Sequence, residues 1–363
     1  MTNERPQTNS VQADGADAPL VSVVVPVYNG SPFLRKALES VLEQTYRPVE
    51  IVVVDDGSRD DSAAIAASYG PPVRVIRQPN FGVGAARNRA ILHARGEIVA
   101  FLDQDDWWLP EKLEKQVACF ADPDVGLVHT GTLHYLQPAA KFVDPIDPSA
   151  RPELLTGECY DRLLAGNAIC NSSVAVRRDL FARVGLTSPL VRGNTVQDYD
   201  LWLRFARVCR FAYVDEPLTV FRIHGEQGTF DRRAMLTEQL RLLERVLREE
   251  PNRRRRQMRD RMAYLYDLLG TFHLDYREHR LARRRFARAL RWRFRARTAI
   301  LWTLAWLPPP VLNGIRQVRR RFKQPQEDPF TLSPHFADPS DSRTVSHTVV
   351  GTSSQADAPH ESS

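Results

Sequence analysis

The stretch Phe101-Leu-Asp-Gln-Asp-Asp-Trp-Trp108 places three carboxylates directly after an apolar segment. Residues 97–102 are mostly apolar, which is typical of a short buried strand in a parallel sheet. Ligands of open α/β sheets bind outside the carboxyl ends of the strands. Asp103 and Asp105 are two residues apart, so a turn between them brings both carboxylates to one point. Carboxylates gathered there suit a hard divalent cation, Mg²⁺ or Mn²⁺, that also holds phosphate oxygens.

A second acidic strand end lies upstream. Residues 49–54 form an apolar run that predicts a strand, and Asp55 and Asp56 follow it. Carboxylates so close together repel one another unless a cation or hydrogen-bond donors meet them. The alternative interpretation of both acidic ends is an ordinary solvated turn, in which each Asp precedes or caps its own helix.

The order of the predicted elements indicates an α/β fold with a mainly parallel sheet. Short apolar strands are predicted at 20–27, 49–54, 73–77 and 97–102, and helices are predicted between them. This alternation within about a hundred residues is the signature of a parallel α/β sheet. The pattern Gly82-Val-Gly84 lacks the third glycine of a dinucleotide-binding loop, so we interpret it as a tight entry to a helix.

After Asp231 the pattern predicts helices only, and arginine becomes the dominant charge. The predicted helices cover 232–248, 253–269 and 279–291. The first has a predicted buried face, because apolar residues recur at helical spacings: Met235, Leu236, Leu240, Leu243 and Val246. Polar, low-complexity sequence at both ends is typical of disorder. The predicted organisation is therefore a disordered leader at 1–18, an α/β domain at 19–230, an arginine-rich helical appendage at 231–323 and a disordered tail at 324–363.

The composition indicates the class of protein. The 363 residues are 43% hydrophobic and 26% charged, values typical of a soluble globular chain. Four cysteines without a C-x-x-C pair argue against a disulfide scaffold or a zinc ribbon, and they favour a reducing cytoplasm. The first twenty residues lack the basic and apolar regions of a signal peptide, and no apolar stretch of about 18 residues predicts a spanning helix.

Two more candidate positions lie near the end of the α/β region. Asp198 and Asp200 open a predicted helix at 197–208, where a carboxylate either interacts with the helix dipole or serves as a general base. Strands are predicted at 211–214 and 218–223, and His224 follows the second of them. A lone histidine is usually structural or on the surface, but beside an acidic site it is also a candidate metal ligand.

Four motifs, in this order, carry a resemblance to a known family. They are Val21-Ser-Val-Val-Val-Pro-Val-Tyr-Asn-Gly30, Val53-Val-Asp-Asp-Gly-Ser58, Asn80-Phe-Gly-Val-Gly-Ala-Ala-Arg-Asn-Arg89 and Phe101-Leu-Asp-Gln-Asp-Asp-Trp107. The region from Val21 to His224 resembles the family 2 glycosyltransferases. The resemblance implies the nucleotide-sugar-binding GT-A fold for residues 19–230. It also implies transfer of a sugar from a nucleotide diphosphate sugar, with inversion at the anomeric carbon.

The resemblance also implies roles for single residues. The positions expected to contact the nucleotide sugar are Pro26, Tyr28, Asp56, Arg87 and Asp103. Asp105 and His224 are expected to hold Mn²⁺ or Mg²⁺, and Asp198 is expected to be the catalytic base. Gln197 stands where the family usually has Glu, which keeps the base and removes a neighbouring charge. The Arg-x-His pattern at 222–224 resembles a late family motif near the diphosphate.

The implied partners are a nucleotide diphosphate sugar donor and a glycan or lipid-linked acceptor, in the synthesis of a surface polysaccharide or lipid-linked glycan. One alternative is a non-catalytic nucleotide-sugar-binding or scaffold protein that keeps the fold. Another is a nucleotidyltransferase, but residues 27–32 lack the Gly-rich, basic loop that such an enzyme needs. Nucleic-acid binding is not expected, because the arginine-rich helices carry no known motif and their aromatic residues resemble core.

The segment from Ala299 to Leu307 is apolar, too short to span a bilayer, and contains Trp302 and Trp306. Arginines flank it on both sides. Tryptophan beside cationic residues is typical of a segment lying at an anionic membrane surface. We therefore expect a cytoplasmic protein, peripheral at the inner face of the cell membrane. The alternative is that the segment packs against the protein and the arginines are merely solvated.

Overall fold

The computed structural model describes residues 18–144, 151–187, 196–225, 232–249, 251–307 and 311. The predicted tail, nearly all of the predicted leader and both limits of the predicted helical region lie outside these residues. The predicted domain limits therefore stay predictions. Within the described residues no helix is both long enough and apolar enough to cross a membrane.

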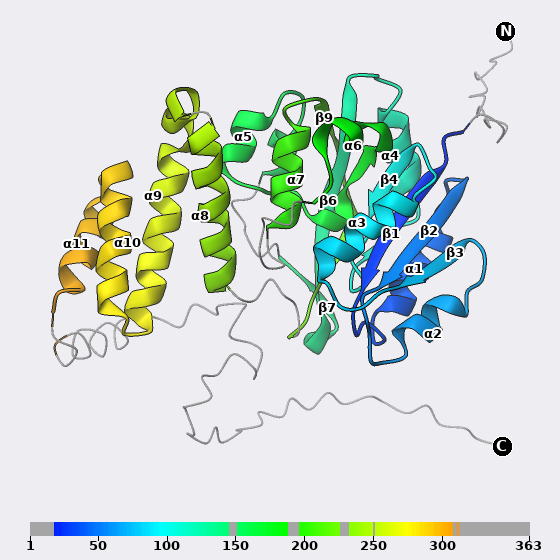
Figure 1. The fold of residues 1–363 in the computed structure, drawn as a ribbon, viewed down its shortest axis with the longest axis horizontal. Coiled ribbons are helices and arrows are strands. Elements are labelled where there is room, and N and C mark those ends of the chain that lie inside the picture. The colour runs from blue at the N-terminus through cyan, green and yellow to red at the C-terminus, as the bar shows by residue number, and fades with distance from the viewer. Residues whose placement is uncertain are drawn as a thin grey trace, which may run out of the picture. The chain divides into compact units, whose positions relative to one another are not determined.

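One mixed sheet forms the α/β part (Figure 1). Within the described residues it has nine strands in the order β3-β2-β1-β4-β8-β6-β9-β5, with β7 paired to β6. The strands are β1 (Val21–Val27), β2 (Val49–Asp55), β3 (Val73–Arg77), β4 (Ile98–Phe101), β5 (Trp107–Trp108), β6 (Val125–Leu136), β7 (Lys141–Val143), β8 (Ala175–Arg177) and β9 (Arg210–Ile223). The longest pairings, β1 with β2 and β6 with β9, are parallel, while β8 pairs antiparallel with β4 and β6. The predicted α/β fold with a mainly parallel sheet is confirmed.

Helices cover both faces of this sheet, which explains the unbroken apolar runs of β1 and β2. The helices of this part are α1 (Leu34–Leu42), α2 (Ser62–Ala67), α3 (Val83–His93), α4 (Lys112–Cys119), α5 (Tyr160–Ala165), α6 (Phe181–Val184) and α7 (Gln197–Phe205). Val23 and Val25 of β1 pack in one core cluster with α1 and α4, whereas Val24 packs in the other with α3, α5 and α7. All three valines are fully buried.

The strand β9 corrects the expectation of two separate strands at 211–214 and 218–223. It is continuous from Arg210 to Ile223 and pairs in parallel with β6. The register shifts where Gly131 faces Pro217. Proline has no N–H to donate to a ladder, so a bulge accommodates it without ending the strand.

The first two helices after residue 231 complete the core on one face of the sheet. They are α8 (Arg232–Glu249) and α9 (Pro251–Asp275). The predicted buried face of α8 is confirmed, since Leu236, Leu240 and Leu243 are at most 4% exposed. These leucines belong to the same core cluster as Trp202 and Phe205 of α7. The arginine-rich helices are therefore packed on the α/β part through apolar contacts.

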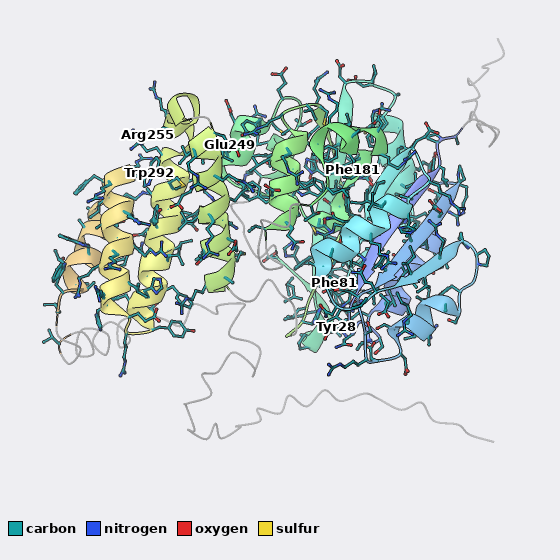
Figure 2. The ribbon with its side chains drawn as sticks, in the orientation of Figure 1. Tyr28, Phe81, Phe181, Glu249, Arg255 and Trp292 are labelled. Carbon is teal, nitrogen blue, oxygen red and sulfur yellow. The ribbon has the colours of Figure 1, made fainter. Side chains whose placement is uncertain are left out.

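The last two helices, α10 (His279–Trp292) and α11 (Ala296–Leu304), extend this packing through a separate small cluster around Phe286. A Cβ on Gly270 of α9 would lie only 2.6 Å from the Phe286 ring, so this close approach of α9 and α10 requires glycine. At the other end of α10, the Arg255 guanidinium of α9 lies 4.9 Å from the Trp292 ring centroid (Figure 2).

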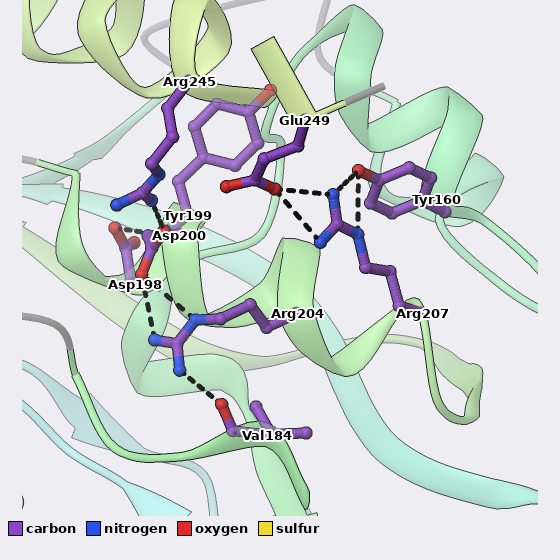
Figure 3. A network of polar contacts seen from close by, with 9 residues as sticks. All are labelled: Tyr160, Val184, Asp198, Tyr199, Asp200, Arg204, Arg207, Arg245 and Glu249. Carbon is purple, nitrogen blue, oxygen red and sulfur yellow. Dashed lines mark hydrogen bonds and ion pairs between the residues drawn. The ribbon is translucent and has the colours of Figure 1, made fainter. Parts of the chain in front are cut away.

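A buried ionic network ties α8 to α7 (Figure 3). The Asp200 carboxylate, 3% exposed, accepts hydrogen bonds from Arg204 Nη2 (2.9 Å) on its own helix and from Arg245 on α8. Arg204 also donates to the Val184 carbonyl oxygen (2.6 Å). Asp200 is thus the shared partner of two guanidinium groups from different helices.

We expect Asp200→Asn to lower the free energy of unfolding by about 2–4 kcal/mol. Loss of one partner from a buried ion pair leaves the other charge uncompensated, and each arginine here is still about a quarter exposed, which moderates the cost. Urea titration followed by circular dichroism measures the change. The exposed Asp124→Asn is the matched control and should stay within about 0.5 kcal/mol of the wild type. Equal effects of the two substitutions would contradict a structural role of Asp200.

Candidate active site

The carboxyl ends of the parallel strands β1, β2 and β4 meet at one edge of the sheet, and the predicted site residues gather there. Val27 ends β1, Asp55 ends β2 and Phe101 ends β4. The backbone joins the first two ends, because the Asp56 N–H donates to the Val27 carbonyl oxygen (2.7 Å). This edge is where open α/β sheets bind ligands.

Asp103 is fixed by groups from three parts of the chain. Its backbone N–H donates to Ser172 Oγ (3.1 Å), and its Oδ1 accepts from Asn171 Nδ2 (2.9 Å) and Arg87 Nη2 (3.1 Å). Loss of hydration raises the pKa of Asp103 although a third of its side chain still meets solvent, and the Arg87 guanidinium opposes that rise. Both carboxylate bonds within the described residues fall on Oδ1, which leaves Oδ2 for a ligand.

Asp105 and His224, which are 119 positions apart in sequence, contact each other directly. His224 Nε2 lies 2.9 Å from Asp105 Oδ2. The His224 ring also packs on Phe33, with 4.4 Å between ring centroids. Arg222 fixes the backbone of the acidic loop. Its Nε donates to the Asp105 carbonyl oxygen (2.7 Å), and its guanidinium lies 4.5 Å from the Trp107 ring centroid.

Asp106, to which sequence reasoning gave no role, is the buried anchor of the acidic loop. It is 1% exposed, and its carboxylate accepts from Ser172 Oγ (2.5 Å) and from the Arg222 backbone N–H (3.0 Å). Burial, with the neighbouring charges of Asp105 and Asp103, holds the pKa of Asp106 well above its usual range. Three carboxyl groups crowded in one short turn disfavour one another's ionisation, and a nearby cation would relieve this repulsion.

Asp198 lies in the first turn of α7 and is half-buried (Figure 3). Burial raises the pKa of its carboxyl group to about 6, although the Arg87 guanidinium and the Tyr199 N–H (2.7 Å) both favour the ionised form. Arg87 is itself 5% exposed, and its Nε has no partner within the described residues. Arg87 thus acts on Asp103 by an ion pair and on Asp198 through space, so the two carboxylates are influenced by the same positive charge.

The predicted nucleoside contacts lie at the same edge with different exposures. Asp56 is 2% exposed, and its carboxylate accepts from Gln78 Nε2 (2.7 Å) and from the backbone N–H groups of Phe81 (2.9 Å) and Gly82 (2.8 Å). Tyr28 is 44% exposed, whereas Pro26 is buried inside β1 (Figure 2). Asp56 therefore shapes the loop before α3, and the nucleotide-binding roles of all three residues stay predictions.

Gly82 and Gly84, at the start of α3, each have a local structural reason, as the interpretation of a tight helix entry requires. Gly82 has φ of 89°, a conformation that a side chain would strain, and it directly precedes α3. A Cβ on Gly84 would lie 2.4 Å from Gln197 Oε1, so this glycine lets α3 and α7 approach closely. The close approach brings Arg87 of α3 near Asp198.

Sequence reasoning missed three further residues that build the site: Gln104, Asn171 and Ser172. Gln104 receives the Tyr28 N–H on Oε1 (2.8 Å) and donates to the Tyr28 carbonyl oxygen (3.1 Å), so it links the ends of β1 and β4. Gln104, Asn171 and Ser172 form these hydrogen bonds with residues at least 66 positions away in sequence. A single sequence gives no pattern for such pairs. Arg222, in contrast, belongs to the Arg-x-His pattern at 222–224 that the resemblance singled out.

The donor set fits a divalent ion only in part. Within the described residues no three His, Cys, Asp or Glu side chains converge on one point. Asp105 and His224 form a pair whose 2.9 Å separation is that of two adjacent ligands on an octahedral ion with bonds of about 2.1 Å. Mg²⁺ commonly takes one or two protein ligands and completes its shell with phosphate oxygens and water. The pair therefore suits an ion that arrives with a diphosphate.

Comparison with known proteins gives sequence relatives and a related fold. Residues 22–185 match the family described as glycosyl transferase family 2. An uncharacterised glycosyltransferase of Rickettsia typhi is 33% identical over 224 residues, 58% of this chain and 66% of the relative. One from Nostoc sp. is 33% identical over 228 residues, 60% of this chain and 69% of the relative. Several curated relatives are longer, and the chain spans as little as 31% of their length.

Among solved structures, a mannosyltransferase from Pyrobaculum calidifontis in complex with GDP-Man and Mn²⁺ has a similar fold. The TM-score is 0.54 at 22% identity, over 81% of each chain. The fold agrees with the GT-A expectation, and the sequence matches cover the acidic strand ends. The chain belongs to the family 2 glycosyltransferases.

Proposed function

We propose that this protein transfers a sugar from a nucleotide diphosphate sugar to an acceptor hydroxyl, with inversion at the anomeric carbon. The observation that carries the proposal is the position of Arg87, which pairs with Asp103 and lies within electrostatic reach of Asp198. The proposed donor-binding carboxylate and the proposed base thereby interact with the same guanidinium group. The nucleotide sugar bound by the mannosyltransferase of similar fold supports this donor class.

In this proposal Asp198 is the catalytic base. An acceptor hydroxyl is a weak nucleophile until a neighbouring group takes its proton, and a base is most effective when its pKa is near the working pH. Burial raises the pKa of Asp198 to about 6, so the carboxylate is mostly ionised at neutral pH yet basic enough to accept a proton. A single base opposite the leaving group gives one displacement and therefore inversion.

Asp200, the next candidate for the base, is less suited to that role. Its carboxylate is buried between Arg204 and Arg245 and is committed to joining α7 and α8. On a helix, positions i and i+2 do not face each other, so Asp198 and Asp200 point to different surroundings. This difference supports Asp198 as the residue that meets the acceptor.

Pro26, Tyr28, Asp56, Arg87 and Asp103 are the proposed nucleotide-sugar contacts. We propose that Asp105 and His224 hold Mn²⁺ or Mg²⁺ together with the donor diphosphate. When bound, such an ion supplies positive charge against the charge that develops on the leaving diphosphate. The turn that carries Asp105 is fixed by the protein itself. Arg222 donates to the Asp105 backbone, and the buried Asp106 anchors the turn.

We also propose that the acceptor is a glycan or lipid-linked molecule met at the cytoplasmic face of a membrane, in surface polysaccharide or lipid-linked glycan synthesis. The cysteines support a reducing compartment, because all four are free thiols. Burial raises the pKa of Cys159 and Cys209 to about 12, so neither thiol is activated for reaction.

The first test is substitution of the base. Asp198→Asn should retain donor binding, measured by calorimetry, and lose roughly 10²-fold or more in turnover, because the amide accepts no proton. Asp124→Asn, on the exposed surface, should keep normal turnover. Near-normal turnover of Asp198→Asn would move the base elsewhere.

The second test is the pH dependence of kcat/KM. The base works only when deprotonated, so kcat/KM should rise as pH increases through about 6 and level off near neutrality. Arg87→Gln removes the positive charge that favours the ionised form, so it should move the rising limb to higher pH. A wild-type profile that is flat from pH 5 to 7.5, or an unmoved limb in the variant, would contradict this assignment.

The third test concerns the metal. Donor binding and turnover should both fall in the presence of a chelator and recover with added Mn²⁺ or Mg²⁺. Asp105→Ala and His224→Ala should each weaken Mn²⁺ binding, measured directly by paramagnetic resonance with nucleoside diphosphate present, while Asp124→Ala should not. Equal Mn²⁺ binding by all of these proteins would exclude the proposed pair as the ligands.

A further inference from the structure

The helix α11 has one face packed and one face exposed. Leu301, Trp302, Leu304 and Ala305 pack against Phe286 and its neighbours in the small core cluster. Ile300, on the other face, is 60% exposed, and the adjoining Trp306 and Phe294 are 61% and 74% exposed. Ala296 and Thr303, four before and three after Ile300, are exposed as well. The outer face of α11 and its flanking aromatic residues thus form an apolar surface, which we call the α11 face.

An arginine stripe runs along α10. Arg280, Arg284, Arg288 and Arg291 are all exposed, and their spacing of four, four and three residues puts them on one side of the helix. The opposite side holds Ala282, Phe286 and Ala289, which are at most 1% exposed. No acidic residue occurs between Glu278 and Glu327, so nothing on this stretch of sequence neutralises the stripe.

The α11 face and the arginine stripe adjoin each other. Arg283, one turn along from Arg280, donates to the Ala305 carbonyl oxygen (3.2 Å) and lies 4.3 Å from the Trp306 ring centroid. Two other arginines near α11 are already paired with α9, namely Arg293 with Asp260 and Arg297 with Asp267. The paired arginines hold the helices together, and the stripe is the part of the positive charge directed to solvent.

We propose that the α11 face and the arginine stripe bind the surface of an anionic lipid bilayer. Apolar and tryptophan side chains lie favourably at the boundary between headgroups and acyl chains, and arginines pair with the lipid phosphates. The proposal rests on the proposed function only for the nature of the acceptor; binding to lipid itself does not depend on catalysis.

Charge and apolarity together favour a bilayer over other occupants. A second copy of the chain in a two-fold contact would bring two arginine stripes together, and like charges repel. A nucleic acid would satisfy the arginines but would leave Ile300, Trp306 and Phe294 facing a phosphate backbone. An anionic bilayer offers phosphate to the stripe and hydrocarbon to the α11 face.

The test is cosedimentation of the full chain with vesicles. Vesicles containing phosphatidylglycerol should bind the protein at low salt, vesicles of phosphatidylcholine alone should bind it weakly, and high salt should release it because surface charge is screened. Arg284→Gln with Arg291→Gln should weaken binding by roughly five-fold per arginine. Arg35→Gln with Lys36→Gln, two exposed cations on α1, should leave it unchanged.

The apolar contribution is tested separately. Ile300→Glu should weaken binding at least ten-fold, whereas Leu92→Glu, at a residue 71% exposed on α3, should not. Thermal unfolding and donor hydrolysis should be unchanged in both variants, since neither residue lies in the proposed site. Absence of binding to phosphatidylglycerol vesicles at low salt, or equal effects of the paired variants, would overturn the proposal. So would a wild-type dimer in sedimentation equilibrium that Ile300→Glu dissociates.

A failure of the proposed function would look different. A protein that binds anionic vesicles normally but neither binds nor hydrolyses nucleotide sugars would refute the transferase assignment and leave the membrane surface standing. A protein that hydrolyses the nucleotide sugar but does not bind anionic vesicles would refute the membrane surface and leave the transferase assignment standing.

Discussion

The ion pair between Arg87 and Asp103 is the interaction on which the rest of the site depends. Arg87 is buried on α3, and its positive charge opposes the rise in pKa that desolvation causes in both Asp103 and Asp198. An unpaired carboxylate at either position would tend to hold a proton at the expense of ligand binding or base catalysis. The position of Arg87 in turn depends on backbone geometry, because Gly84 allows α3 to pack directly against Gln197 of α7.

Besides Arg87, neutral donors and the Arg222 guanidinium stabilise the acidic turn after β4. Ser172 bonds to both Asp103 and Asp106, and Arg222 bonds to the Asp105 carbonyl oxygen and to Asp106. These contacts fix the backbone and the buried carboxyl groups of the turn. The turn is therefore preorganised, and it carries the 2.9 Å contact between Asp105 and His224.

The arginine-rich helices are part of the same structural unit as the site. The leucines of α8 share a core cluster with α7, and Arg245 bonds to Asp200, two residues from Asp198. The α8 helix packs on α9, α9 packs on α10, and α10 carries α11. The surface proposed to meet lipid is thereby joined through packed helices to the helix that carries the proposed base. A reaction on a membrane-bound acceptor would benefit from that connection, because the catalytic domain would be held at the bilayer.

The sequence alone determined the elements and the chemistry available at their ends. Apolar β-branched runs predicted the parallel strands, helical periodicity predicted the buried face of α8, and the four motifs predicted the family. Only the tertiary structure decided which side chains meet. Asp106 proved to be the buried anchor, Asp200 proved to face α8, and His224 was brought to Asp105 across 119 residues. Local patterns encode which face of an element is buried, but long-range partners follow from strand order and from close approaches such as that at Gly84, for which one sequence carries no local signal.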